Sequence, residues 1–206
     1  MNGKAAWLAP LTGTIFVVVV IVGFLIGGEP PDPDNDPADI AGFYVDNETV
    51  QAVGALLAGI AATALVFFGG YLRRVLQVGA GRGEFLSTVA MGGLVIYAAG
   101  IALDATIVMA LVSTADDLDP IAIQTLSAFH ENDFMLFAVG TQVFLLAAGV
   151  SIVQHATLPK WLGWVAIVTA VIAVTPIGFV SFFVGLLWIL VVSIVLTTRA
   201  RSDAPA

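Results

Sequence analysis

The chain has 206 residues, of which 59% are hydrophobic and 11% are charged, and its mean hydropathy is +1.02. A soluble domain carries about 25% charged residues, so this composition excludes a soluble protein and predicts one whose surface is covered by lipid. The net charge of −8 argues against a nucleic-acid partner, and the lack of cysteine excludes disulfides and thiolate metal ligands.

The first apolar run covers residues 7–28 and follows Lys4, which predicts an uncleaved signal anchor. Residues 29–48 then form an acidic segment that is rich in proline over its first part. Prolines and acids disfavour a helix and leave little to bury, so we expect an irregular external loop here. At its end, Asp46 and Asn47 are suited to cap the next helix.

The second and third spans are predicted over residues 49–72 and 85–113, and the acid Asp104 interrupts the latter. A fourth helix is expected over residues 121–155, beginning next to Pro120, which suits a first helical turn. This helix is longer than a bilayer needs. We therefore expect its first turns to stand outside the hydrocarbon.

The fifth and sixth spans are predicted over residues 161–175 and 178–197, with a tight turn at Thr175-Pro176-Ile177-Gly178. The fifth is short, at roughly 22 Å. A single helix over 161–197 would have about 37 residues, far beyond the usual span of roughly 17–25. The chain is thus predicted to be one all-α integral membrane domain over residues 1–206, a polytopic transmembrane bundle with six spans.

The basic residues give this topology an orientation. In a six-span arrangement all seven Lys and Arg side chains fall on one side, and the 29–48 loop faces the other side with acids alone. The positive-inside rule then places both termini in the cytoplasm of a multi-pass protein of the cell membrane. The basic residues are Lys4, Arg73, Arg74, Arg82, Lys160, Arg199 and Arg201.

Asp104 is the most informative polar residue, because an acid within a membrane helix is costly and marks a candidate functional site. At 1.5 Å per residue, Asp104 and Asp133 lie about 29 and 32 Å from the inner ends of their helices, so both reach the outer edge of the hydrocarbon. His130 shares a helical face with Asp133. Asp104, His130, Asp133 and Asn132 therefore form the candidate ligand-binding cluster. Its alternative role is helix packing, since polar residues also bond membrane helices together.

Three functions remain open at this point. The first is a non-enzymatic membrane protein that binds or passes a small solute, ion or lipid at an outward-facing polar cleft. The second is a structural or accessory subunit without a ligand site. The third, an embedded metal-dependent hydrolase around His130, has the least support, because a catalytic zinc site wants three protein ligands. We predict no catalytic residue, metal ligand or cofactor; the lipid bilayer is the expected partner, the small ligand is unknown, and a homo-oligomer is compatible with the sequence.

The turn Leu158-Pro159-Lys160-Trp161-Leu162-Gly163-Trp164 before the last two spans resembles that of a bacterial membrane family known as domain of unknown function 4386. The Tyr44, Asp46 and Asn47 segment and the Arg73–Arg74 pair are also similar to that family. The resemblance covers about residues 5–198 and implies a six-helix membrane protein. The family has no established activity, so the resemblance implies no site residues, and the long acidic loop departs from the compact form expected.

Overall fold

The computed structural model describes residues 8–80, 84–173, 175 and 177–202, and all regular structure in this part of the chain is helical. The predicted all-α class is therefore confirmed. The helices of this part are, in chain order, α1 Leu8–Gly27, α2 Pro37–Asp46, α3 Glu48–Ala80, α4 Glu84–Thr114, α5 Pro120–Glu131, α6 Met135–His155, α7 Lys160–Ile172 and α8 Phe179–Ser202.

Five segments of the described chain are long and apolar enough to cross a membrane: α1, α3, α4, α8 and the stretch Pro120–His155. These segments fit a helical membrane bundle. The helix α7 is apolar too, but its 13 residues reach only about 20 Å, less than the roughly 30 Å of bilayer hydrocarbon. Length and composition thus account for five spans. Whether α7 forms part of a sixth span depends on the path of the chain between α7 and α8.

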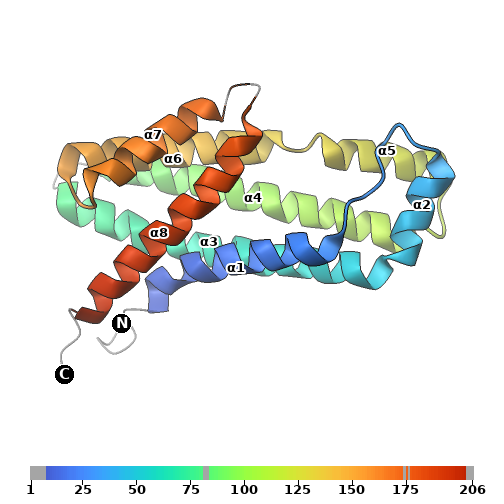
Figure 1. Ribbon diagram of the computed structural model, residues 1–206, viewed down its shortest axis with the longest axis horizontal. Coiled ribbons are helices and arrows are strands. Elements are labelled where there is room, and N and C mark those ends of the chain that lie inside the picture. Colours follow the sequence, from blue (N-terminus) through green and yellow to red (C-terminus); the bar gives the residue numbers. More distant parts are fainter. Residues whose placement is uncertain (1–7, 81–83, 174, 176, 203–206) are drawn as a thin grey trace.

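The helices divide into a bundle and a cap at one of its ends. Figure 1 shows α2 and α5 gathered beside the last turns of α4 and the first turns of α3, whereas the α6–α7 connection and the end of α8 lie at the opposite end. We call α2, α5 and these adjoining ends of α3 and α4 the cap. It has a hydrophobic core of its own, which includes Ile40, Tyr44, Leu111 and Ile123.

The helix α2 lies within the segment predicted to be an irregular loop, and for this part the prediction is wrong. Pro37 occupies the first turn, where a helix needs no backbone donor, and the Asp36 carboxylate accepts a hydrogen bond from the Ala38 amide at 2.9 Å. Ile40 and Tyr44, four residues apart, share one buried face. Proline and acid here begin a helix, and the segment does have side chains to bury.

The fourth predicted helix, 121–155, is broken, so the expectation of one continuous helix is also wrong. Asn132 ends α5, and its side-chain amide donates to the Ala128 carbonyl oxygen at 2.8 Å. Short polar side chains of this kind compete with the helical hydrogen bonds of the backbone. The 21 residues of α6 are about 32 Å long and suffice for a span, which leaves α5 to the cap.

Close contacts between backbones hold the bundle together. A Cβ atom added at Gly93 of α4 would lie 2.4 Å from the Phe144 amide nitrogen of α6, and one at Gly149 would lie 2.7 Å from the Gly163 carbonyl oxygen of α7. Small residues permit such approaches in membrane helices. A Cβ atom added at the adjacent Gly92 would meet nothing within 4 Å.

A turn separates α7 from α8. The Gly178 amide donates to the Thr175 carbonyl oxygen at 2.8 Å, and the helices end and begin at Ile172 and Phe179. This arrangement confirms a turn rather than one long helix, although Pro176 itself lies outside the described residues. In Figure 1 this connection lies near the start of α6, well away from the end where α7 begins.

Candidate functional site

The cap helix α5 returns along the last turns of α4, which brings the predicted polar residues together. The Asp119 carboxylate caps α5 by accepting a hydrogen bond from the Ile121 amide at 2.9 Å, and Pro120 fills the first turn. Asp119 and Pro120 thus start α5 directly after the short connection from α4. His130, in its last turn, comes to lie opposite Asp104 of α4.

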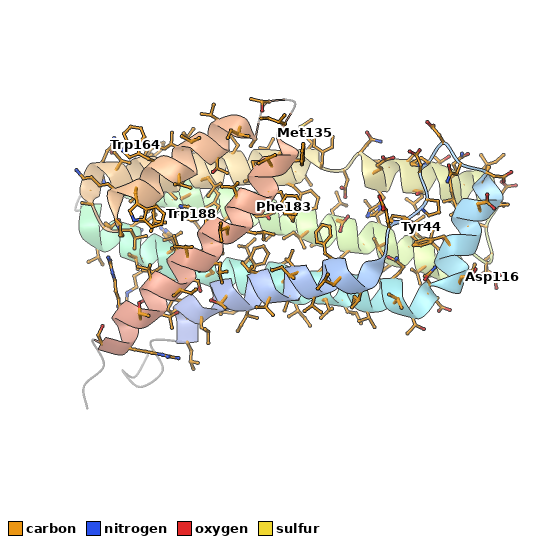
Figure 2. The ribbon with its side chains drawn as sticks, in the orientation of Figure 1. Tyr44, Asp116, Met135, Trp164, Phe183 and Trp188 are labelled. Atoms are coloured by element: carbon orange, nitrogen blue, oxygen red, sulfur yellow. The ribbon has the colours of Figure 1, made fainter. Side chains whose placement is uncertain are left out.

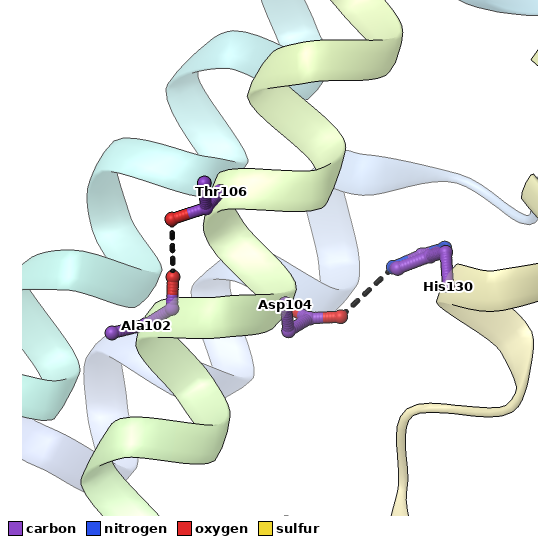
Figure 3. A network of polar contacts seen from close by, with 4 residues as sticks. All are labelled: Ala102, Asp104, Thr106 and His130. Carbon is purple, nitrogen blue, oxygen red and sulfur yellow. Dashed lines mark hydrogen bonds and ion pairs between the residues drawn. The ribbon is translucent and has the colours of Figure 1, made fainter. Parts of the chain in front are cut away.

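The side chains of Asp104 and His130 form an ion pair between the two helices (Figure 3). The Nε2 atom of His130 lies 2.8 Å from Oδ1 of Asp104, and the side chains are 21% and 31% exposed. The contact predicted from helical rise is therefore present. Because both side chains are only partly exposed, solvent and salt screen this pair less than they screen a pair on an open surface.

Two other polar residues of the neighbourhood bond within their own helices. The Thr106 hydroxyl, two residues after Asp104, donates to the Ala102 carbonyl oxygen at 2.7 Å, as Figure 3 shows. Asn132, which the sequence assigns to the cluster, is exposed and bonds back to Ala128. The described geometry gives Asn132 the role of ending α5 and gives it no contact with the ion pair.

Asp133 lies in the linker between α5 and α6, next to the pair. One of its carboxylate oxygens, Oδ2, is buried and has no hydrogen-bond partner among the described residues. A buried polar oxygen without a partner costs free energy unless it is protonated or meets a donor. Asp133 is thus the one member of the predicted cluster whose bonding is incomplete in this part of the chain.

Tyr44 of α2 adds a buried hydroxyl that the sequence did not single out for this site. Its side chain is 1% exposed, and the hydroxyl forms no hydrogen bond of ordinary geometry with a described residue. Burial raises the pKa of this hydroxyl above its ordinary value; the adjacent Ser127 hydroxyl acts in the opposite direction, and the negative charge of Asp104 adds to the increase. Tyr44 was missed because its segment was expected to be a loop.

Asp104 and His130 are in direct contact, and the residues of the cluster line neither of two hollows in the described structure. One hollow is a narrow crevice between α3, α4 and α6, beside Leu72 and Phe144, and the other is an apolar groove between α1 and α8. Among the described residues, no group of three His, Asp or Glu side chains is arranged to hold a metal ion. What the arrangement does chemically is join α4 and α5 through the ion pair.

The chain matches no protein-family model, no curated protein and no solved structure. The resemblance to the domain of unknown function 4386 family therefore stays an expectation from the sequence. Function has to be argued from the geometry described above.

Proposed function

We propose that this chain is a multi-pass protein of the cell membrane with a structural or accessory role rather than an enzymatic one. The observation that carries the proposal is the direct contact of 2.8 Å between Asp104 and His130. In this role the pair fastens the cap to the bundle, because α5 belongs to the cap and α4 runs through both.

The proposal includes six spans and cytoplasmic termini. Two observations support six crossings: α7 begins at the end of the bundle where α6 finishes, and the α7–α8 turn lies well away from that end (Figure 1). The described basic side chains support the orientation, because they fall at the end opposite the acidic cap and the positive-inside rule assigns that end to the cytoplasm. They are Arg73, Arg74, Lys160, Arg199 and Arg201.

A second candidate function is the binding of a small solute or ion at the same cluster. The buried, unpartnered Oδ2 of Asp133 and hydroxyl of Tyr44 favour it, since two incompletely bonded polar groups lie close to one ion pair. The hydrolase alternative gains no support from the described residues, because they contain no constellation suited to a metal.

Metal content and stability together test these roles. We expect the purified protein and its His130→Ala variant to carry the same trace metal by mass spectrometry, while the variant unfolds at a lower temperature. One bound metal per chain that disappears in His130→Ala, and that Leu118→Ala retains, would overturn the structural role in favour of a binding site. Leu118 suits this control because it is an exposed residue of the cap connection.

A further inference from the structure

The helices α1 and α8 cross at a polar contact near one end of the bundle. The Ser193 hydroxyl donates to the Pro10 carbonyl oxygen at 2.6 Å, and it accepts a hydrogen bond from the Thr14 amide at 2.9 Å. From this crossing the two helices diverge toward the cap end, as Figure 1 shows. Their divergence opens an angle on the surface of the bundle.

A groove of about 340 Å³ occupies this angle, and its lining is aliphatic and aromatic throughout. Val17 and Val20 contribute from α1, and Leu186 contributes from α8. The Phe24 and Phe182 rings approach each other across the groove, with 5.9 Å between their centroids. Figure 2 places Phe183 in the same angle, where its ring is 61% exposed.

The side chains that line the groove favour a hydrocarbon chain over a second helix as its occupant. Where this protein packs helix on helix closely, glycine lies at the contact, as at Gly93 against Phe144 and at Gly149 against Gly163. The groove has bulky Phe, Leu, Ile and Val side chains and no glycine. A second helix could not approach the backbone here, whereas a thin and flexible hydrocarbon chain fits between the side chains.

Charge indicates the headgroup that accompanies this hydrocarbon chain. Leu25 lines the groove near the end of α1, and Glu29 comes just after this helix. The connection that follows carries further acids, among them Asp32 and Asp34, and residues 28–36 contain no Lys or Arg. An anionic headgroup at this end would be repelled, while one that bears a positive amine would be attracted.

We propose that the groove between α1 and α8 is a binding site for one acyl chain of a phospholipid with a zwitterionic, amine-bearing headgroup. The lipid belongs to the leaflet on the cap side. The chain lies between the Val20 and Leu187 side chains, and the amine lies over the acids at the mouth of the groove.

Native mass spectrometry of the full chain, released from nanodiscs of equimolar phosphatidylethanolamine and phosphatidylglycerol, tests this site. We expect one retained phosphatidylethanolamine per chain, preferred roughly fivefold over phosphatidylglycerol, as one charge near a surface predicts. Val20→Trp should fill the groove and abolish the retention. Val18→Trp is the matched control, because Val18 is exposed on the same helix and does not line the groove.

A second pair of variants guards against a folding defect in Val20→Trp. Leu187→Trp fills the groove from α8, and Ile194→Trp places the same side chain on α8 outside it. Circular dichroism should show both to be helical, with lipid lost only from Leu187→Trp. Equal retention of both lipids, or retention that survives both groove-filling variants, would overturn the site. A dimer that only the groove-filling variants dissociate would identify the occupant as a second copy and overturn it as well.

Discussion

His130 Nε2 lies 2.8 Å from Asp104 Oδ1, at the level where α4 passes from the bundle into the cap. The cap-core residues of α4 and α5, among them Ile107, Leu111 and Ile123, all lie between these two residues along the chain. The ion pair therefore acts where the hydrophobic core of the cap ends.

The Asp104 and His130 side chains should be energetically coupled. We expect Asp104→Asn and His130→Ala each to lower the free energy of unfolding, and the double variant to be less destabilised than the sum of the two. The coupling energy should be about 1 kcal/mol, since both side chains retain some exposure. Chemical denaturation in detergent measures all four corners of the cycle. A coupling energy indistinguishable from zero would show that the ion pair does not stabilise the contact between the cap and the bundle.

Single cysteines should report the orientation cleanly, because the native chain has none. We expect an impermeant maleimide applied to intact cells to label cysteine at Asn35, in the cap-end connection, and not at Ser202, at the end of α8. Labelling of both positions after permeabilisation is the control. The reverse pattern in intact cells would invert the proposed topology.

Two adjacent glycines offer a matched test of the α4–α6 contact. Gly93→Ala should destabilise the protein by about 1–3 kcal/mol, because its Cβ would lie 2.4 Å from the Phe144 backbone nitrogen. Gly92→Ala should be neutral or stabilising by about 0.5–1 kcal/mol, since nothing lies within 4 Å and alanine favours the helix. Thermal unfolding of both variants tests this difference, and similar melting temperatures would contradict the close contact.

The first turn of α5 should depend on the Asp119 carboxylate, which lies in the connection between α4 and α5. Asp119→Ala removes the hydrogen bond to the Ile121 amide and should cost about 1 kcal/mol. Hydrogen exchange in the first turn of α5 should accelerate, while α6 stays protected. Asp117→Ala, two residues earlier and exposed, is the control and should leave exchange unchanged. Equal acceleration in both variants would point to charge rather than capping.

Helical rise and apolar length were enough to predict the long helices and the approach of Asp104 to His130. The same reasoning failed for α2, because proline was treated as a helix breaker although Pro37 occupies the first turn, where it is tolerated. It also failed for the break at Asn132, because apolar periodicity continues across residues that compete for backbone hydrogen bonds. The groove between α1 and α8 depends on a crossing at Ser193, and no pattern within either helix specifies that crossing.

The separation of charge along the bundle has a consequence for the energized cell. With the basic end inside, the membrane potential, negative on the cytoplasmic side, draws Arg73, Arg74 and Lys160 inward and favours the acids of the cap outside. Carrying one such charge across the membrane against the field costs about 2.3 kcal/mol per 100 mV. The membrane potential would thus favour this orientation after insertion, and collapse of the potential would remove this contribution without breaking a single contact in the fold.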